Sequence, residues 1–490
     1  MDRYNVDVLI IGAGAIGTAV ARELSKFEQT LLVVDRLNDV GGDASKSNSA
    51  IVHTGFDAPP GSLESQMVVH SNPMFSGLCS ALDIPFKQSG AILVAASDQE
   101  DAELQDILKK ARENHVFDVE PLSAKEVLDL EPAVTPEVKR GLLVPRESIV
   151  DPFLLVVAQA ENAAANGMQF LTDCEVVGLT RRRDGFTVES TRGVIRSKYV
   201  VNAAGLYTDR VSGFLGIDDF KVHARRGQFH VIDRATPLGI SHIILPVPTK
   251  ITKGKLLAPT VHGNWLIGPT AEELEDKSAH QTTKAGLEEV VASVKRLIPS
   301  LDSGSVITQY AGLRPVREPG GYHFRRFDDI PGYLELSGIR STGLSASLAV
   351  AVVAKSMLIE MGMPSDRKPT TTAKREGIPC FRDADTLARE QLIRSDPRYD
   401  HVICRCETVT EAEVVQSIHR TPGARDIDGV KRRVRAGLGR CQAGFCGMRI
   451  PQIIARELGI SLEEVTKKGK GSEILVGVTK MMRMGCHEDH

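Results

Sequence analysis

The feature that most constrains the fold is a glycine-rich turn close to the N-terminus. The apolar run Val6–Ile11 leads into Gly12-Ala13-Gly14-Ala15-Ile16-Gly17, and a helix-like segment over 16–26 is followed by a second apolar run that ends in Asp35. Strand, G-x-G-x-x-G turn, helix and strand with a terminal acid, in that order, are typical of the βαβ unit that binds dinucleotides. The helix start would meet a pyrophosphate, and Asp35 is placed to accept hydrogen bonds from a ribose. A purely structural glycine turn is the alternative.

The composition limits the domain count and the classes of partner. A chain of 490 residues exceeds what one hydrophobic core usually serves, so two or three domains are expected. The formal net charge is −3 and no basic block stands out, so we expect no nucleic-acid partner. The apolar run at 6–11 is far shorter than the roughly 20 residues of a membrane span and lacks the flanks of a secretory signal. We expect a cytoplasmic protein with no transmembrane segment, which a partner could hold at a membrane surface.

Two later glycine turns favour FAD over NAD, which shares the same fingerprint. One closes the short apolar run Tyr199–Asn202 with Ala203-Ala204-Gly205, and the other, between Gly338 and Gly343, precedes the small-residue run Ser345–Ala354. Such turns could grip a long, extended cofactor again, with the later helix start facing a flavin edge that becomes anionic on reduction. Ordinary tight turns in a sheet are the alternative for each segment taken alone.

Further motifs along the first 350 residues resemble a known family. They are Asn48-Ser49-Ala50-Ile51-Val52-His53-Thr54-Gly55, Val201-Asn202-Ala203-Ala204-Gly205, Arg226-Gly227-Gln228, Gly263-Asn264-Trp265-Leu266-Ile267-Gly268-Pro269, Ala311-Gly312-Leu313-Arg314-Pro315 and Gly338-Ile339-Arg340-Ser341-Thr342-Gly343-Leu344. Together they resemble the FAD-dependent oxidoreductases of D-amino-acid oxidase type, in the branch of glycerol-3-phosphate and 2-hydroxyglutarate dehydrogenases. This resemblance implies an α/β fold: a Rossmann-type FAD-binding domain over 1–363 with an inserted antiparallel-sheet substrate domain within about 80–145 and 220–325.

The resemblance and the glycine turns together point to the residues that bind FAD. They lie at the turns, at the end of the second strand, in the loop after it and on one later strand: Gly12, Gly14, Ala15, Ile16, Gly17, Asp35, Arg36, Ser45, Asn48, Ser49, Val177, Ala204, Gly205, Gly312, Gly343 and Leu344.

Four cysteines near the C-terminus predict a second cofactor. Cys404 and Cys406 are followed, after 34 residues, by Cys441 and Cys446. Four thiolates match a [2Fe–2S] cluster, which takes two sulfur ligands on each iron. Zinc also accepts four thiolates, but zinc pairs are usually spaced C-x₂₋₄-C, so the C-x-C pair is unusual for it. Cysteines that bind nothing are a third alternative.

The cysteine segment also resembles a known domain. Arg435-Ala436-Gly437-Leu438-Gly439-Arg440 precedes Cys441, and a helix-like run, Arg449–Leu458, follows Cys446. This pattern is similar to the bacterioferritin-associated-ferredoxin-like domain that is appended to large subunits of anaerobic glycerol-3-phosphate dehydrogenases. It implies a small, mostly helical [2Fe–2S] domain over 401–460, with a linker at 364–400 and a C-terminal tail at 461–490.

A flavin and a one-electron cluster predict a dehydrogenase chemistry. A substrate C–H would deliver hydride to the flavin, a base would remove the hydroxyl proton, and electrons would leave singly through the cluster to a protein electron acceptor or companion subunit. His53, in the loop near the flavin, is the first candidate for the base, and Arg314 is the first candidate to bind a substrate anion. Weaker candidates for these two roles are His230 and His262 for the base, and Arg225, Arg226, Arg317 and Lys255 for the anion.

The resemblance implies glycerol 3-phosphate as the substrate, within the general class of small anionic hydroxy compounds. A 2-hydroxy acid dehydrogenase of the 2-hydroxyglutarate type is the nearest rival, because Arg314 could equally hold a carboxylate. An amine or amino-acid dehydrogenase comes third. A non-catalytic electron-transfer or redox-sensing subunit is the alternative from a different class.

Overall fold

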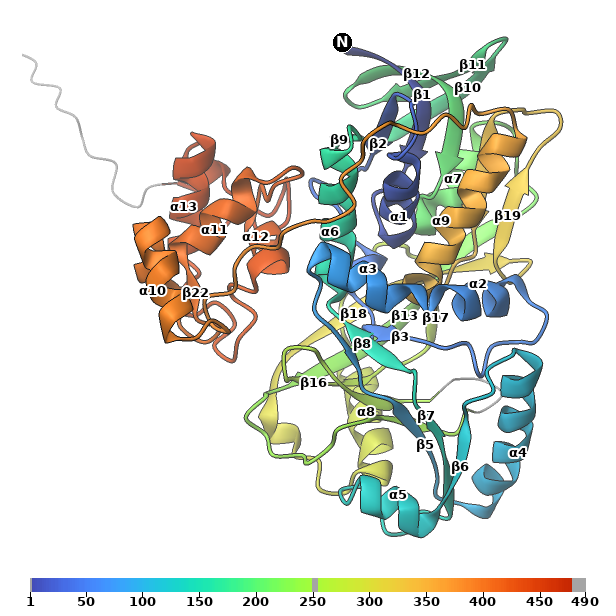
Figure 1. Ribbon diagram of the computed structural model, residues 1–490, viewed down its shortest axis with the longest axis vertical. Coiled ribbons are helices and arrows are strands. Elements are labelled where there is room, and N and C mark those ends of the chain that lie inside the picture. The colour runs from blue at the N-terminus through green and yellow to red at the C-terminus, as the bar shows by residue number, and fades with distance from the viewer. Residues whose placement is uncertain (1, 249–253, 478–490) are drawn as a thin grey trace, which may run out of the picture. The chain divides into compact units, whose positions relative to one another are not determined.

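The computed structural model describes residues 2–248 and 254–477. The chain divides into two compact units, with the boundary between Gly377 and Ile378. The N-terminal unit holds two large sheets with their helices, and the C-terminal unit is mostly helical (Figure 1). The predicted α/β class with a small helical C-terminal domain is therefore confirmed.

A largely parallel sheet forms the nucleotide-binding part of the N-terminal unit. Its parallel strands are β1 (Asp2–Ile11), β2 (Leu31–Val34), β9 (Gln169–Leu171), β12 (Gly193–Asn202) and β20 (Tyr333–Ser337). Antiparallel pairing adds β10 (Val176–Arg182), β11 (Gly185–Ser190) and β19 (His323–Arg326). The C-terminal ends of β1, β2 and β12 lie at one edge, which is where open α/β sheets bind their ligands.

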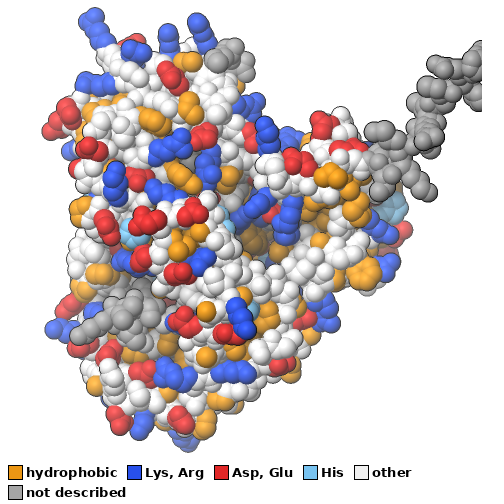
Figure 2. All heavy atoms as spheres, turned by 180° about the vertical axis from the view of Figure 1, so that it is seen from behind, with side chains coloured by type: hydrophobic (Ala, Val, Ile, Leu, Met, Phe, Trp, Pro, Cys, Tyr) orange, Lys and Arg blue, Asp and Glu red, His pale blue; other side chains and the backbone are white. Residues whose placement is uncertain are grey.

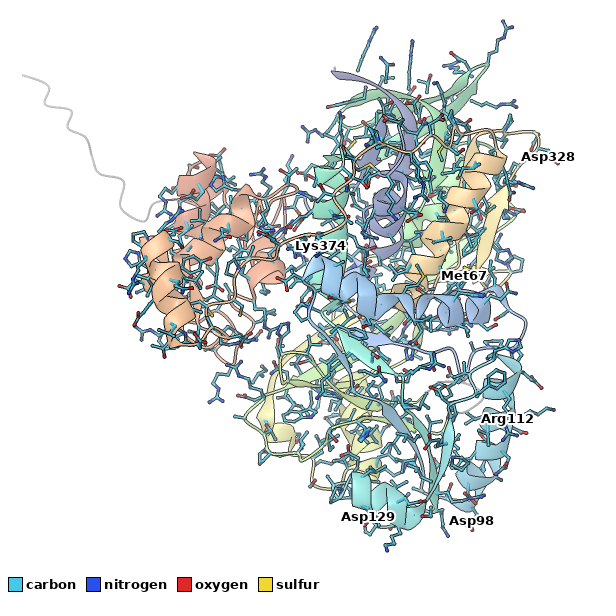
Figure 3. All side chains as sticks on the ribbon, viewed as in Figure 1. Met67, Asp98, Arg112, Asp129, Asp328 and Lys374 are labelled. Atoms are coloured by element: carbon cyan, nitrogen blue, oxygen red, sulfur yellow. The ribbon has the colours of Figure 1, made fainter. Side chains whose placement is uncertain are left out.

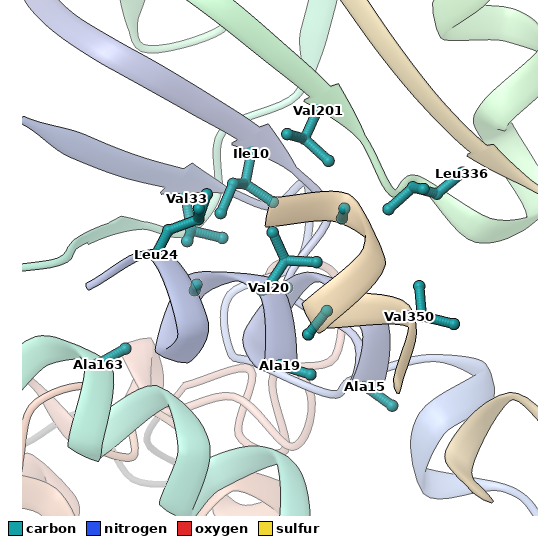
Figure 4. Packing of buried hydrophobic residues seen from close by; sticks show 14 of the residues in the cluster. Ile10, Ala15, Ala19, Val20, Leu24, Val33, Ala163, Val201, Leu336 and Val350 are labelled. Carbon is teal, nitrogen blue, oxygen red and sulfur yellow. The ribbon is translucent and has the colours of Figure 1, made fainter. Parts of the chain in front are cut away.

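Helices α1 (Ala15–Leu24), α6 (Pro152–Ala165) and α9 (Gly343–Glu360) pack around a shared apolar core. Val20 faces the strand residues Ile10 and Val33 there, and Val350 lies on the side of Leu336 (Figure 4). Many of the buried positions on α1 and α9 are alanine or glycine, so the two helices can pack closely. By length and composition α9 could span a membrane, but 56% of it is buried inside this unit, which is typical of a core helix.

A nine-stranded sheet occupies the ranges in which the sequence predicts a substrate domain. It contains β5 (Ala91–Ala95), β6 (Glu120–Ser123), β7 (Arg140–Val144), β13 (Lys221–Ile232), β14 (Ile243–Pro246), β15 (Leu256–Pro259), β16 (Trp265–Gly268), β17 (Glu272–Leu274) and β18 (Val306–Glu318). Its pairs are antiparallel except that β5 and β14 run parallel. Helices α4 (Asp98–Glu113), α5 (Ala124–Leu130) and α8 (Lys284–Leu297) accompany it, and Asp98 and Arg112 on α4 project outward (Figure 3).

A small sheet and short helices complete the N-terminal unit. The sheet consists of β3 (Ile51–Val52), β4 (Phe86–Gln88) and β8 (Ser148–Val150), and the helices are α2 (Leu63–Ser71), α3 (Met74–Leu82) and α7 (Thr208–Gly213), with short turns of 3₁₀ helix at 44–46, 205–207 and 303–305. On the face of this unit that Figure 2 shows, Lys and Arg side chains are interspersed with Asp and Glu. This mixture agrees with the near-neutral formal charge of −3.

The C-terminal unit starts inside the predicted linker. Its elements are α10 (Thr386–Ser395), a 3₁₀ turn at 397–400, β21 (Val402–Cys404), β22 (Val409–Thr410), α11 (Glu411–His419), α12 (Ile427–Val434), α13 (Arg449–Leu458) and a 3₁₀ turn at 462–464. The predicted linker 364–400 therefore splits in two. Residues 364–377 lie along the N-terminal unit, where Lys368 N donates to Lys26 O, whereas Phe381 and Tyr399 stack in the C-terminal unit with ring centroids 6.2 Å apart.

The predicted tail also contributes to the C-terminal core. Val465 is fully buried among the residues of that core, and Ile427 N donates to Thr466 O. Most residues of 461–477 are polar or glycine, so the burial of Val465 is not apparent from the sequence, and the segment looks like a tail. Residues 478–490 of the predicted tail lie outside the described residues.

Candidate functional site

A cavity opens at the C-terminal ends of β1, β2 and β12, with an empty volume of about 850 Å³ that includes solvent at its mouth. Of the residues predicted to bind FAD, seven line it: Gly12, Gly14, Asp35, Arg36, Ser45, Ala204 and Gly205. The cavity therefore brings together glycine turns and an acid from four separate segments of the chain.

The glycines of the first turn have separate steric roles. Gly12 has φ +106°, and a Cβ there would lie 2.5 Å from the Ala203 carbonyl oxygen. A Cβ at Gly17 would lie 1.8 Å from the Gly12 carbonyl oxygen, so this glycine lets α1 pack against the turn. Both positions exclude a side chain, which is the requirement of a dinucleotide turn. Ala15 and Ile16 lie in the first turn of α1, next to the cavity wall but not in its lining.

Asp35 is held at the end of β2 by two backbone donors. Its Oδ2 accepts from Ala13 N at 2.7 Å and its Oδ1 from Leu37 N at 2.9 Å. Burial raises the pKa of this carboxyl despite those bonds. Beside it, the Arg36 guanidinium lies 4.5 Å from the Tyr207 ring centroid and donates to Asp43 at 2.8 Å. Each Asp35 oxygen keeps a lone pair for a ribose hydroxyl.

Ser45 and Asn48 order the loop that faces the start of α1. Ser45 Oγ accepts from Ala15 N at 2.9 Å, so a hydroxyl already lies where a phosphate would meet the helix N-terminus. Asn48 bonds to both sides of the loop, to Ser45 O and Ala50 N, each at 2.8 Å. Ser49 lies in the same loop. On its outer side a Cβ at Gly312 would lie 1.9 Å from Ser47 O, so β18 can approach this loop only with glycine there.

Val177 does not line the cavity, in contrast to the prediction. Its side chain is 45% exposed, whereas the neighbouring Val176 is buried and lines the cavity. Successive side chains of a strand point to opposite faces, and the register of β10 also shifts between Val176 and Gly178. The side chain of β10 that lines the cavity here is therefore Val176 and not Val177.

His53 forms a pair with a carboxylate that the sequence did not reveal. His53 Nδ1 lies 2.9 Å from Glu147 Oε2, and the Glu147 side chain is 0% exposed. Glu147 Oε1 accepts from Thr54 N at 2.6 Å and from Thr54 Oγ1 at 3.0 Å. A carboxylate only accepts hydrogen bonds, so Nδ1 would be the donor in this pair, and Nε2 of the neutral ring would then be an acceptor.

The start of α9 lies against the same histidine. Ser345 Oγ accepts from His53 N at 2.9 Å and donates to Ile51 O at 3.0 Å. Gly343 and Leu344 form the first residues of α9. The later glycine turn and the His53 loop, which are about 290 residues apart in sequence, therefore meet at one place.

Of the other candidate histidines, His262 has a carboxylate partner and His230 is buried in a strand. His262 Nε2 lies 2.8 Å from Asp151 Oδ2, while Asp151 Oδ1 caps the N-terminus of α6. His230 is buried in β13, and burial lowers its pKa. His262 therefore shares a carboxylate partner with His53, but His53 also bonds to Ser345 at the start of α9.

Arg314 differs from the other candidate cations. Its guanidinium donates to Thr270 O at 3.3 and 3.4 Å, and among residues 2–248 and 254–477 no carboxylate forms an ion pair with it. Burial lowers its pKa to about 10, which leaves it charged at neutral pH. The other cations already have partners: Arg225 with Glu273, Arg226 with Glu272, Lys255 with Glu289, and Arg317 with Ser337 and Pro319. Arg314 is thus the candidate best prepared for a substrate anion.

The four C-terminal cysteines form two pairs. The thiols of Cys404 and Cys446 hydrogen-bond to each other, as do those of Cys406 and Cys441. The bond to Cys446 lowers the pKa of Cys404 to about 6. Within the described part of the chain, no three His, Cys, Asp or Glu side chains converge as one metal-ion site. Two pairs of sulfur donors fit a two-iron cluster, with two thiolates for each iron, better than one tetrahedral zinc.

Comparison with protein families decides the class. A model described as FAD dependent oxidoreductase matches residues 7–357, and a model described as BFD-like [2Fe-2S] binding domain matches residues 402–456. The chain belongs to the FAD-dependent oxidoreductase family. As a family member it is an oxidoreductase with FAD as its cofactor, and the second match assigns Cys404, Cys406, Cys441 and Cys446 to a domain that binds a [2Fe–2S] cluster rather than zinc.

Individual members of the family match over most of their length. A glycerol 3-phosphate dehydrogenase of Caloramator mitchellensis is 39% identical over 97% of this chain and 99% of its own. The anaerobic glycerol-3-phosphate dehydrogenase subunit A1 of Haloferax volcanii is 24% identical over 92% of this chain and 83% of its own. The solved structure of dithionite-reduced L-α-glycerophosphate oxidase from Mycoplasma pneumoniae with FAD bound has a TM-score of 0.73 at 29% identity, and the match covers 76% of this chain and 98% of that one.

Proposed function

We propose that this FAD-dependent oxidoreductase is a glycerol 3-phosphate dehydrogenase that produces dihydroxyacetone phosphate and passes the electrons through its [2Fe–2S] cluster to a protein acceptor. The observation that carries the proposal is the similarity over 97% of the chain, including the cysteine domain, to a protein named glycerol 3-phosphate dehydrogenase. An oxidase that gives its electrons directly to oxygen has no need for the cluster.

Two side chains of this protein would act on the substrate. Arg314, charged and without a carboxylate partner among the described residues, would bind the phosphate through both of its terminal nitrogens. His53 would accept the hydroxyl proton at Nε2 while Glu147 holds its Nδ1 proton. Bound FAD supplies the hydride acceptor. Both side chains adjoin the loop that contains Ser47. β18, which carries Arg314, contacts Ser47 at Gly312, and His53 follows this loop in the chain.

The remaining predicted residues would hold the cofactors. The first glycine turn, Asp35 and Ser45 would bind the adenosine and pyrophosphate, and Gly343 and Leu344 would present the start of α9 to the flavin. The four cysteines would hold the cluster, which supplies a one-electron relay. We further propose that the protein works with companion subunits, since the relative from Haloferax volcanii is named as a subunit. We propose that it does so in the cytoplasm, and at the membrane surface if a partner binds there.

Anaerobic mixing tests the substrate. Protein with FAD and cluster is mixed with glycerol 3-phosphate, 2-hydroxyglutarate or an amino acid, and flavin absorbance is followed in a stopped-flow instrument. We expect rapid bleaching with glycerol 3-phosphate and slow or no bleaching with the other two. Faster bleaching with 2-hydroxyglutarate would assign Arg314 to a carboxylate, and no bleaching with any compound would favour an electron-transfer subunit.

A further inference from the structure

The segment that carries the second cysteine pair has an unusual charge pattern. Residues 429–456 contain seven Lys or Arg and no Asp or Glu. Elsewhere the chain mixes the two signs, with 60 basic and 63 acidic residues in total. The stretch lies between Asp428 and Glu457 and includes both Cys441 and Cys446. Positive charge is therefore concentrated around the cluster ligands.

Part of this charge is turned inward. Arg432 and Arg433 are 6% and 4% exposed, and Arg435 Nε donates to the buried Glu407 at 3.0 Å. Buried cations of this kind compensate the negative charge of a cluster held by four thiolates. The exposed cations of the same region are therefore not needed to compensate the charge of the cluster.

Other side chains of the region face solvent. Phe445 is 70% exposed and Met448 is 51% exposed, on either side of Cys446, which is 1% exposed. Arg405, Arg440 and Arg449 are exposed as well. Neither Arg405 nor Arg449 forms an ion pair with any described residue. These five residues, the cysteine-loop face, expose two large apolar side chains and three cations.

Short contacts hold the two cysteine segments together. Cys406 hydrogen-bonds to Cys441, and a Cβ at Gly439 would lie 2.3 Å from the Cβ of Cys406. Arg405 lies between the two cysteines of the first pair, and Phe445 lies between those of the second. The exposed residues are therefore sequence neighbours of the cluster ligands on both loops.

We propose that the cysteine-loop face is the docking surface for an acidic one-electron carrier protein. Aromatic, Met and Arg side chains are the residue types enriched at the centres of protein interfaces. Arg405 and Arg449, which form no ion pair with a described residue, would attract a carrier with a negative surface and speed its encounter. The proposal rests on the proposed function, because it concerns the exit of the electrons. Each oxidised alcohol yields two electrons and two protons, so two carriers would each take one electron.

Cytochrome b5, which is acidic, and cytochrome c, which is basic, are suitable probes. Protein whose flavin and cluster have been reduced with dithionite, then freed of excess reductant, is mixed with either cytochrome, and haem reduction is followed at rising ionic strength. Because the protein is reduced with dithionite and not by a substrate, the result is independent of the proposed glycerol 3-phosphate activity. Binding of each oxidised cytochrome to the oxidised protein is measured in parallel by isothermal titration calorimetry.

We expect fast reduction of cytochrome b5 that slows about tenfold or more as salt screens the charges, and measurable binding at low salt. The double variant Arg405→Glu/Arg449→Glu should lose both effects while keeping its cluster EPR signal and its flavin spectrum. Lys468→Glu is the matched control, because residues 466–467 hydrogen-bond to the start of α12, opposite the end where the cysteine loop begins. It should behave like the wild type.

Three results would overturn the proposal. The first is equal salt dependence for cytochrome b5 and cytochrome c. The second is an Arg405→Glu/Arg449→Glu variant that reduces cytochrome b5 as fast as Lys468→Glu does. The third is an intact protein that self-associates through this face, or binds anionic phosphatidylserine vesicles through it, without binding cytochrome b5.

Discussion

The two cofactor sites of this protein are built in opposite ways. The cavity that we propose holds FAD, in the N-terminal unit, draws on backbone turns and on segments from Ile11 to Val211. The cysteine site in the C-terminal unit depends on four sulfur atoms within residues 404–446. A site formed by backbone turns should lose its cofactor when a turn is distorted, whereas a site formed by ligand atoms should lose its cofactor when a ligand atom is removed. Each site should therefore be open to disruption without loss of the other.

The largest expected effect is on the cluster. Cys446→Ser removes one of four thiolate ligands and should abolish the [2Fe–2S] EPR signal of the dithionite-reduced protein, with FAD content unchanged. Cys380→Ser is the control, because Cys380 is an exposed cysteine of the same unit that belongs to neither pair. A variant Cys446→Ser protein with a normal EPR signal would show that another ligand holds the cluster.

The complementary change empties the other site. Gly12→Ala places a methyl group 2.5 Å from the Ala203 carbonyl oxygen at a φ of +106°, so the turn must distort. We expect purified protein with little or no FAD but a normal cluster signal, as measured by flavin absorbance and EPR. Gly213→Ala is the matched control, since a Cβ there has no neighbour within 4 Å. Equal FAD content in both variants would contradict the steric role of Gly12.

A smaller effect should separate substrate binding from FAD binding within the N-terminal unit. Arg314→Ala should lower the second-order rate of flavin reduction by glycerol 3-phosphate by about 10²-fold or more, because hydrogen bonds to a buried charge contribute about 1.5–3 kcal/mol each. FAD content should stay unchanged. Arg225→Ala, which removes a cation already paired with Glu273, should cost far less. Loss of FAD from Arg314→Ala would assign the residue to the structure of the cofactor site.

The same contrast explains how much could be predicted from sequence. The first turn, Asp35 and the four cysteines are local patterns, so they were predictable residue by residue. Glu147 was not, because it is 94 residues from His53 and meets it only through the register of β3 and β8, in which Val52 lies opposite Ser148. Side-chain direction on β10 was also beyond prediction, since Val176 is buried and lines the cavity while Val177 is exposed, on a strand whose register shifts between Val176 and Gly178. Contacts between residues far apart in the chain cannot be predicted from local sequence patterns.

The smallest of these effects should come from the Glu147–His53 pair. Glu147→Gln keeps the shape of the side chain but offers an amide to His53 Nδ1, so the ring loses the negative partner that orients it and supports its positive charge after proton transfer. Flavin reduction at saturating glycerol 3-phosphate should slow by about 10–100-fold, which is less than the roughly 10²–10⁴-fold that a general base contributes, because His53 itself stays in place; FAD content should be unchanged. His53→Asn should slow it further, and the rate left in that variant should be insensitive to a second change at Glu147, because the carboxylate acts through the ring.

His262→Asn serves as the control, since its Asp151 partner already caps α6. If Glu147→Gln still slowed the reaction in a His53→Asn background, the carboxylate would have a role of its own, and the N-terminal site would depend on a ligand atom as directly as the cysteine site does.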